Sequence, residues 1–329
     1  GRTLVSPEGT VSFDWSATFA RISFTGGYLA LEAGDTGKDW FNVWIDREPT
    51  ADPDRIVTID RDTTLVLFQA KERKPMAHRI VIQKRTEGEQ GRAIFKAFTA
   101  EGAFLQAECI RPRVIEFVGD SYTCGYGSEN SVREDPFRPA DENPSKTYAD
   151  IIGRYFGADV LHISHSGQGI ARNYDDAGRG RHMPDRYPCT FDLMEEPAWD
   201  FSAITPSITV IYLGTNDFST GRQPTYPEFK AGWMRLLQSI KEKYGAEHPV
   251  LCVAPLHNRD IHDYVFRIVE TCSLPNVHYA GLPAQVHDQD GDLGASWHPN
   301  YSGHLKKACN LIPVLSTITG WPMENKPIE

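Results

Sequence analysis

The sequence predicts an α/β protein built from two parts. An N-terminal β-sandwich (jelly roll) is expected over residues 1–110, and a three-layer α/β/α domain with a parallel sheet over residues 111–329. Two patterns predict this division: short β-rich runs bounded by Gly, Asp and Pro fill the first part, and strands alternate with helices in the second. The length of 329 residues is also enough for two domains of ordinary size.

The first part contains runs of β-forming residues at a spacing that is typical of sandwiches. They cover residues 11–15, 19–24, 28–33, 41–45, 55–60, 64–70, 79–84 and 93–100. Several runs alternate apolar and polar residues, as residues 20–24 do, so each strand is expected to bury one face and expose the other. Such strands pair into sheets that enclose a core.

In the second part, the alternation of strands and helices predicts a parallel sheet covered by helices on both faces. In chain order we expect strand 114–118, helix 147–156, strand 158–163, strand 207–213, helix 225–244, strand 250–254, helix 262–273, strand 277–280 and a last helix after Asn300. Two long connections, 119–146 and 164–206, are rich in Gly, Pro, Asp and Arg. Loops at the carboxyl ends of parallel strands commonly build the functional site.

Capping residues mark three of the expected helix starts. Ser145 is placed to cap the first helix, Thr225 and Glu228 form a capping box, and Asn300 is placed to cap the last helix. The last helix should present one apolar face to the sheet. That face consists of Leu305, Ala308, Leu311 and Ile312.

Charge and composition narrow the classes of function. The net charge is −10, from 34 basic and 44 acidic residues, so a nucleic acid or an anionic membrane is an unfavourable partner and a neutral substrate is expected. Hydrophobic residues make up 40% of the chain, but no run approaches the about 18 apolar residues of a membrane span. The six cysteines form no C-x-x-C pair, and we expect free, mostly buried thiols.

Residues that suit acyl-transfer chemistry follow three of the expected parallel strands. A Gly-Asp-Ser triplet ending in Ser121 follows the first, a Gly-Gln-Gly triplet at 167–169 the second, and Asn216 the third, while His298 precedes the last helix. In a parallel sheet these residues meet at one edge. There they would supply a nucleophile, a backbone oxyanion donor from one of the two glycines, a side-chain oxyanion donor and a base.

Nucleotide-binding and metal-binding patterns fit less well. The glycines of 167–169 lack the third glycine of a dinucleotide fingerprint, since Arg172 stands there, and residues 34–39 lack the length of a P-loop. His162 and His165 could begin a zinc site, but no third ligand follows at suitable spacing. The sequence therefore predicts neither a nucleotide cofactor nor a metal.

These blocks resemble those of the SGNH or GDSL-like hydrolases, and in detail the chain is similar to carbohydrate esterase family 2. The similarity rests on residues 119–127, 166–174 and 297–299, and it extends to the β-sandwich that precedes the hydrolase domain in that family. The resemblance implies hydrolysis of acetyl esters on plant polysaccharides such as xylan and glucomannan, with no cofactor, by a secreted or periplasmic enzyme.

The resemblance also implies a role for each site residue. By this carry-over, Ser121 is the nucleophile, His298 is the base, and Gly167 and Asn216 are the oxyanion donors, with Gly169 as the alternative glycine.

One position departs from the superfamily pattern. Ala295 stands three residues before His298, where most members carry the Asp of a triad. Asp292 is six residues before the histidine and is expected not to reach it. Because the imidazole still needs an acceptor for its second N–H, we expect a backbone carbonyl of this loop to hold it.

Trp297 and the neighbouring loops bear on the choice of substrate. Trp297 is either a loop-packing residue or a platform for the apolar face of a sugar ring. A lipase or thioesterase would use the same blocks but would need an apolar trough, whereas loops 128–145 and 172–190 are charged and rich in Pro. A non-catalytic sugar-binding protein would have lost Ser121 or His298. The sequence thus predicts a serine acetylesterase acting on polysaccharides, and it does not indicate the oligomeric state.

Overall fold

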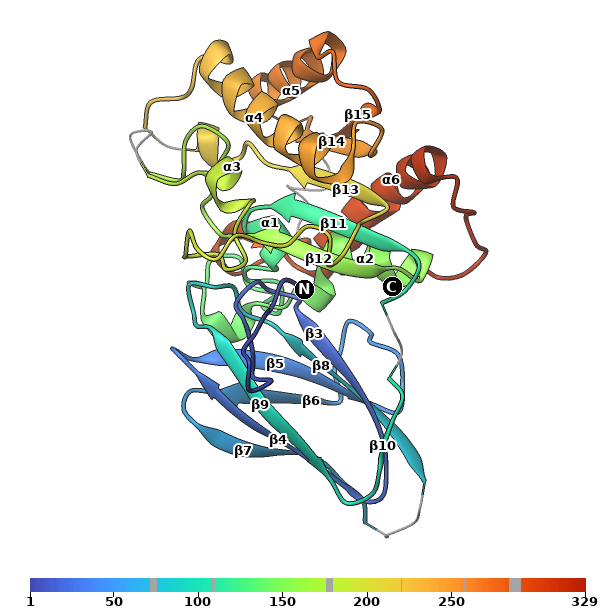
Figure 1. The fold of residues 1–329 in the computed structure, drawn as a ribbon. Helices are drawn as coiled ribbons and strands as arrows, with labels where there is room; N and C mark the ends of the chain where they lie inside the picture. The colour runs from blue at the N-terminus through green and yellow to red at the C-terminus, as the bar shows by residue number, and fades with distance from the viewer. Residues whose placement is uncertain (72–75, 108–109, 176–179, 220, 257, 284–290) are drawn as a thin grey trace.

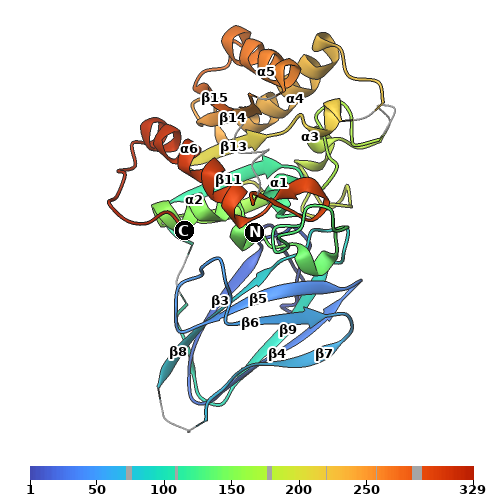
Figure 2. The same ribbon diagram turned by 180° about the vertical axis from the view of Figure 1, so that it is seen from behind.

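The computed structural model describes residues 1–71, 76–107, 110–175, 180–219, 221–256, 258–283 and 291–329. It consists of a β-sandwich, drawn at the bottom of Figure 1, and an α/β domain above it. The view from behind in Figure 2 shows helix α6 (Tyr301–Thr319) lying across the α/β sheet. The fold class expected from the sequence is confirmed.

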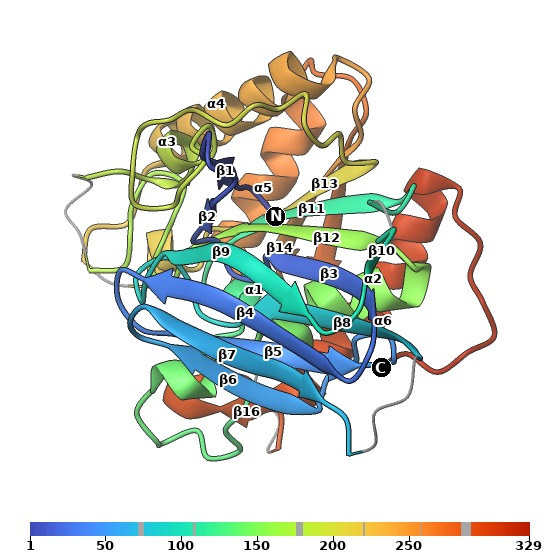
Figure 3. The same ribbon diagram turned by 60° about the horizontal axis from the view of Figure 1, so that its bottom comes forward.

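Two five-stranded antiparallel sheets form the sandwich, in the orders β1-β2-β9-β4-β7 and β10-β3-β8-β5-β6 (Figure 3). The strands are β1 (Leu4–Val5), β2 (Val11–Phe13), β3 (Phe19–Thr25), β4 (Tyr28–Asp35), β5 (Asp39–Ile45), β6 (Arg55–Ile59), β7 (Thr63–Gln69), β8 (Ala77–Lys84), β9 (Ala93–Ala100) and β10 (Phe104–Leu105). Phe13, Phe24, Phe41 and Phe95 are buried in the core of the sandwich. The sequence does not predict β1 and β10, because two residues are too few to show alternation.

The second sheet is parallel throughout, in the order β12-β11-β13-β14-β15. Its strands are β11 (Val114–Gly119), β12 (Asp159–Ser164), β13 (Ile208–Tyr212), β14 (Val250–Pro255) and β15 (Val277–Leu282). One face packs against α2 (Tyr148–Phe156) and α6, and the other against α4 (Tyr226–Tyr244) and α5 (Arg259–Thr271). The chain leaves β11 to one side for β12 and returns to the other side for β13, so the end of β11 is the switch point at which such sheets bind ligands.

Two helix starts follow the sequence prediction. Thr225 and Glu228 form the capping box of α4, and the Asn300 side chain accepts a hydrogen bond from Gly303 N–H at the start of α6. The apolar face expected for α6 is also buried or half-buried. It comprises Leu305, Ala308, Leu311 and Ile312.

The predicted cap at Ser145 is wrong. Pro144 begins a short 3-10 turn, η2 (Pro144–Lys146), whose N-cap is Asn143, and helix α2 starts after Thr147. The Ser145 hydroxyl donates instead to the Thr50 carbonyl of the sandwich at 2.9 Å. Proline is favoured at the first position of a helical turn. Here Pro144 starts a separate short turn, which contains Ser145 and ends before α2 begins.

Buried polar contacts join the two domains. The Arg85 Nε donates to the Glu142 carbonyl at 2.9 Å, and the Trp15 indole donates to the Thr190 carbonyl at 2.9 Å. In each pair one residue comes from the sandwich and the other from the α/β domain. The sandwich is therefore packed against the α/β domain and not merely tethered to it.

Five cysteines lie in the described part of the chain and all are free, while Cys109 lies outside it. Cys124, Cys189 and Cys252 are buried, as expected for structural thiols. Of the helices in the described ranges, none combines the length and the apolar character needed to cross a membrane.

Candidate active site

Ser121 lies at the carboxyl edge of the parallel sheet. Strand β11 ends at Gly119, Asp120 caps the short helix α1 (Ser121–Cys124), and Ser121 is its first residue, with 6% of its surface exposed. A side chain at position 119 would not fit, because its Cβ would lie 2.0 Å from Thr123 Oγ1. The glycine of the Gly-Asp-Ser triplet thus permits the close turn that presents Ser121.

His298 contacts Ser121 directly. The distance from His298 Nε2 to Ser121 Oγ is 2.9 Å, and Nδ1 lies 2.8 Å from the backbone carbonyl oxygen of Ser296. Because a carbonyl can only accept, Nδ1 carries the proton and Nε2 accepts the Ser121 hydroxyl. The imidazole is therefore in the tautomer that a general base for Ser121 needs.

The acceptor on Nδ1 is a backbone carbonyl, as the sequence predicts. The Asp292 carboxylate accepts hydrogen bonds from the Ser302 hydroxyl, at 2.8 Å, and from the Lys306 ammonium. Among the described residues, the side chain of His298 has no carboxylate partner. Burial lowers the pKa of His298 to about 4, and the Ser296 carbonyl offsets only part of this effect.

The loop that carries His298 has an unusual backbone. Ser296 and Trp297 both adopt positive φ, 52° and 62°, in the turn η5 (Ala295–Trp297). This region is unfavourable for residues other than glycine. Backbone bonds from Ser296 N–H to the Asp135 carbonyl, at 2.8 Å, and from Trp297 N–H to the Arg133 carbonyl, at 3.1 Å, hold the turn. The loop after α1 thus fixes the carbonyl that orients His298.

The two candidate glycines differ in what their N–H groups do. Gly169 N–H donates to Asn173 Oδ1 at 3.2 Å, and a Cβ at this position would lie 1.8 Å from the Arg172 carbonyl oxygen. Gly167 N–H donates to no described residue, and Gly167 has a φ of +78°. Gly169 is therefore required by packing, whereas the Gly167 N–H is available to a ligand.

Asn216 lies beside the same edge, in the turn η3 (Asn216–Phe218). Its Nδ2 donates to the Gln168 carbonyl at 2.8 Å and to Asp120 Oδ2 at 3.3 Å. The structure thus brings Ser121, His298 and Asn216 together, with the 167–169 turn connected through the Gln168 carbonyl.

Asp217 was missed by the sequence analysis. Its carboxylate accepts the backbone N–H groups of Ile170, Ala171 and Arg172 at 2.7–2.9 Å and so holds the segment after the 167–169 turn. Burial raises the pKa of Asp217 to about 6, although these hydrogen bonds lower it. An acid directly after Asn216 is visible in the sequence, but its burial is not.

Two buried ionisable groups, Asp120 and Lys307, interact electrostatically next to Ser121. Burial raises the pKa of Asp120 to about 7 and lowers the pKa of Lys307 to about 7, while the attraction between the two groups opposes both shifts. The Lys307 ammonium also lies 4.9 Å from the ring centroid of Tyr122. These residues pack the floor of the site, and the sequence analysis did not single out Lys307.

Trp297 is exposed at the rim of the site, with 56% of its surface accessible. One face of its ring is covered by the Arg133 guanidinium, 4.6 Å from the ring centroid. On the inner side of the rim, the Tyr126 ring lies 4.5 Å from the His298 ring and stacks on Phe137. Exposure of this extent does not suit a residue whose purpose is loop packing.

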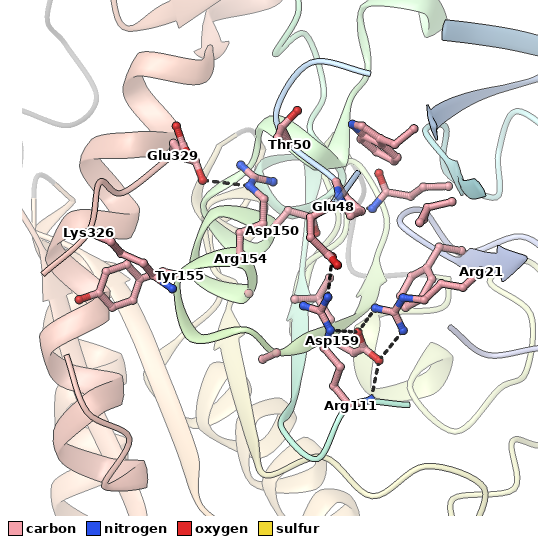
Figure 4. Close-up of a pocket in the computed structure, with 18 of the residues that line it drawn as sticks. Arg21, Glu48, Thr50, Arg111, Asp150, Arg154, Tyr155, Asp159, Lys326 and Glu329 are labelled. Carbon is pink, nitrogen blue, oxygen red and sulfur yellow. Dashed lines mark hydrogen bonds and ion pairs between the residues drawn. The ribbon is translucent and has the colours of Figure 1, made fainter. Parts of the chain in front are cut away.

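A cavity of about 280 Å³ lies elsewhere, at the domain junction (Figure 4). Its charged lining is internally paired: Asp159 accepts hydrogen bonds from the Arg21 guanidinium and from the Arg111 backbone N–H. Neither Ser121 nor His298 lines this cavity. The candidate active site is instead the open edge of the sheet.

One group of described residues could approach a cation. Possible ligand atoms of Glu87, Cys124 and Glu142 lie within 4.8 Å of one another, all buried. Burial raises the pKa of the Cys124 thiol and of the Glu142 carboxyl, which opposes the loss of a proton that metal binding requires. Glu87 already accepts a backbone N–H, from Ser166. We assign the group to the hydrogen-bond network of the domain junction, and the absence of a metal or cofactor stays a prediction.

Comparison with known proteins agrees with this architecture. Residues 117–306 match the GDSL-like Lipase/Acylhydrolase family, and residues 1–107 match the N-terminal domain of carbohydrate esterase 2. Fold and site thus define a GDSL-like acylhydrolase. Within that class, the chain belongs to carbohydrate esterase family 2 and is a hydrolase that resembles acetylxylan esterases.

Three relatives illustrate the match. A family two carbohydrate esterase from Clostridium thermocellum, solved in complex with cellohexaose, superposes with a TM-score of 0.88 at 30% identity over 98% of each chain. The cellulase/esterase CelE of Acetivibrio thermocellus is 32% identical over 93% of this chain, which spans only 38% of CelE. An acetylxylan esterase / glucomannan deacetylase of Cellvibrio japonicus is 26% identical over 98% of this chain and 88% of its own length.

Proposed function

We propose that the protein is a serine esterase that removes O-acetyl groups from plant cell-wall polysaccharides, such as xylan or glucomannan or their oligosaccharides. The observation that carries the proposal is the 2.9 Å contact between Ser121 Oγ and a His298 imidazole whose other nitrogen is fixed by the Ser296 carbonyl. A hydroxyl activated in this way attacks an ester carbonyl and forms an acyl-enzyme.

In the proposed reaction, His298 Nε2 takes the Ser121 proton as Oγ attacks the acetyl carbonyl, and then returns it to the sugar oxygen that leaves. Water attacks the acetyl-enzyme in the same way and releases acetate. Among the described residues, the acceptor that stabilises the imidazolium at Nδ1 is the Ser296 carbonyl. With this acceptor in place of a carboxylate, most of the stabilisation of the transition state must come from the donors at the oxygen of the acetyl carbonyl.

The oxyanion donors in this proposal are the N–H groups of Ser121 and Gly167 and the amide of Asn216. The first two donate to no other described residue, so they can meet the substrate without breaking a bond. Asn216 would exchange its longer hydrogen bond, the 3.3 Å contact with Asp120, for the oxyanion. Gly169 has no part in it because its N–H is used by Asn173.

A carbohydrate substrate is supported by the rim of the site. The Trp297 ring is more than half exposed although Arg133 lies over it, and a wide apolar ring suits the C–H face of a pyranose. The names of the Cellvibrio relatives and the cellohexaose bound to the Clostridium enzyme point to the same substrate class. Because such polymers lie outside cells, we further propose that the enzyme is secreted or periplasmic.

The test compares acyl groups and leaving groups in the wild-type enzyme and Ser121→Ala. Aryl acetate, butyrate and octanoate would be assayed beside acetylated xylan and glucomannan, with acetate measured directly. We expect acetyl esters to be preferred, and Ser121→Ala to lower kcat by about 10³-fold or more. A preference for octanoate would favour the alternative, a GDSL-like lipase or thioesterase, and full activity of Ser121→Ala would refute the mechanism.

A further inference from the structure

A buried turn of the sandwich reaches the loop that carries the free Gly167 N–H. The turn connects β8 to β9, and its residue Glu87 is only 1% exposed. The next residue, Gly88, approaches the α/β domain so closely that a Cβ there would lie 2.7 Å from Asp192 Oδ2. The sandwich thus inserts backbone and a carboxylate into the other domain at this point.

The Glu87 carboxylate contacts the residues that follow strand β12. Its Oε2 accepts the Ser166 N–H at 2.6 Å and the Cys124 thiol at 3.6 Å, and it lies 3.5 Å from His165 Nδ1. Ser166 is the residue directly before Gly167. A buried side chain from the first domain is therefore hydrogen-bonded one residue away from the predicted oxyanion donor.

The geometry of this segment shows what the contact can control. Gln168 N–H donates to the His165 carbonyl at 3.2 Å, which closes a four-residue turn with Gly167 in third place at a φ of +78°. A positive φ at that place is the mark of a type II turn. The peptide at the centre of the turn carries the Gly167 N–H, and conversion to a type I turn would flip this peptide and reverse the direction of its N–H.

We propose that Glu87 is a positioning residue for the oxyanion hole. By holding the Ser166 N–H, it fixes the second residue of the turn and keeps the Gly167 N–H aimed at the substrate. On the opposite side, the Gly167 carbonyl accepts the Tyr174 N–H at 2.7 Å. The sandwich is then a part of the catalytic apparatus, not only a neighbour of it.

The charges around Glu87 support this role. Although burial alone would lower the pKa of His165, the carboxylates of Asp192 and Glu87 raise it to about 9, so the imidazolium persists at neutral pH. A carboxylate that is balanced by a cation is a strong acceptor for a backbone N–H. Loss of that acceptor would leave the half-buried Ser166 N–H unpaired, which favours rearrangement of the turn.

Asp14 provides a matched control within the same domain junction. Like Glu87, it is a buried carboxyl of the sandwich that accepts a backbone N–H of the α/β domain, here that of Asp192 at 3.0 Å. Among the described residues, it makes no hydrogen bond or ion pair with the 165–168 turn. It is linked to the turn only indirectly, through Asp192, whose carboxylate lies 2.6 Å from His165 Nδ1. Asp14→Asn therefore reports the structural effect of altering a carboxyl at the junction while the Glu87–Ser166 hydrogen bond stays in place.

The experiment compares Glu87→Gln, Glu87→Ala and Asp14→Asn with the wild-type enzyme. The proposal rests on the proposed function, so three readouts are used: kcat and KM on an aryl acetate, the Ki of a boronic acid that forms a tetrahedral adduct with Ser121, and the rate of Ser121 labelling by a fluorophosphonate. We expect Glu87→Ala to lower kcat by roughly 10- to 100-fold with little change in KM, against 10²–10³ for complete loss of one donor. Glu87→Gln should give a smaller loss, because the amide oxygen still accepts.

The boronic acid and the fluorophosphonate distinguish a misplaced oxyanion donor from a loss of fold stability. The Ki of the boronic acid should rise, and the labelling rate fall, in proportion to the loss of kcat, whereas Asp14→Asn should lower only the melting temperature. Losses in kcat that are equal in the Glu87 and Asp14 variants, or a kcat of Glu87→Ala within twofold of wild type, would overturn the proposal. If the wild-type enzyme did not hydrolyse acetyl esters, the proposed function would fail, yet the labelling rates would still decide the role of Glu87.

Discussion

At the scale of single residues, the state of His298 determines how the site responds to pH. A general base must be neutral to accept the Ser121 proton, and burial lowers the pKa of His298 to about 4. The neutral form therefore dominates above about pH 4, so we expect kcat/KM to remain high at pH 5 and to fall below about pH 4. If the base had the ordinary pKa of histidine, kcat/KM would fall to half its maximum near pH 6.5.

The pH profile is measured by acetate release, with circular dichroism as the check that the protein remains folded in acid. Burial raises the pKa of two carboxyls near the site, Asp120 and Asp217, to about 7 and about 6, so both titrate at higher pH than His298. If kcat/KM instead fell between about pH 6 and 7, and this fall shifted in Asp120→Asn, the fall would be assigned to these carboxyls. That result would contradict the prediction for His298.

Asp292 is expected to matter for stability and not for chemistry. Its carboxylate is buried and holds Lys306 and the Ser302 hydroxyl. Asp292→Asn should keep kcat within about tenfold, whereas loss of a true triad acid costs about 10⁴. The free energy of unfolding should fall by about 1–3 kcal/mol, because a buried charged hydrogen bond is weakened. Denaturant unfolding and kinetics on the same preparation test both statements, and a loss of activity by thousands would give Asp292 a triad role.

Trp297 is the residue whose change should separate binding of sugar from chemistry. If the free face of its ring carries a sugar, Trp297→Ala should lower kcat/KM on acetylated oligosaccharides much more than on a small aryl acetate. The ring is exposed, so the melting temperature should change little. Equal losses on the two substrates would return Trp297 to a packing role and weaken the carbohydrate assignment.

At the scale of elements, the 165–168 turn offers a sharp test because its glycine needs a positive φ. Gly167→Ala has room for its Cβ, 3.5 Å from that of Tyr174, but should strain the backbone by about 1–2 kcal/mol and push the turn toward type I. We expect kcat to fall by about 100-fold. Gly157→Ala is the matched control: Gly157 also has a positive φ, 59°, at the end of α2, with nothing near its Cβ.

The control should lose a similar amount of stability and keep its activity. If Gly157→Ala and Gly167→Ala lowered kcat alike, the effect would reflect general destabilisation. If Gly167→Ala were as active as wild type, the Gly167 N–H would not be an oxyanion donor.

The elements also show which sequence signals suffice. Thr225 with Glu228, and Asn300, were found because a capping residue and the group it binds lie within four residues of each other. Ser145 failed because Asn143 and Pro144, just before it, form a competing turn. Ser121 and Asn216 could be found because parallel strands bring their carboxyl ends to one edge, and His298 because it directly precedes the last helix. Glu87 could not, because its contact with Ser166 depends on how two domains dock.

At the scale of the whole molecule, the domain junction predicts that the two parts unfold together. Trp15 of the sandwich belongs to the same hydrophobic core as α4 and α5, and the Arg2–Glu116 ion pair across the junction is fully buried. Separating the domains would expose both, so neither part should survive the unfolding of the other. Calorimetry, tryptophan fluorescence and residual activity should give one coincident transition. Two resolved transitions, with activity lost in only one, would show that the domains are independent.

The carbonyl of Ser296 has a consequence for how such a site changes over generations. A triad acid is a side chain, and a single codon change removes it, but every amino acid supplies a backbone carbonyl. A substitution at position 296 leaves the carbonyl itself in place, but it removes the Ser296 hydroxyl that accepts the Phe137 N–H at 3.0 Å. The position of the carbonyl also depends on the loop that accepts the Ser296 and Trp297 N–H groups, so shortening or redirecting that loop would displace it. Insertions and deletions between residues 130 and 137, more than point mutations beside His298, are the changes by which a lineage could lose hydrolysis and keep the fold.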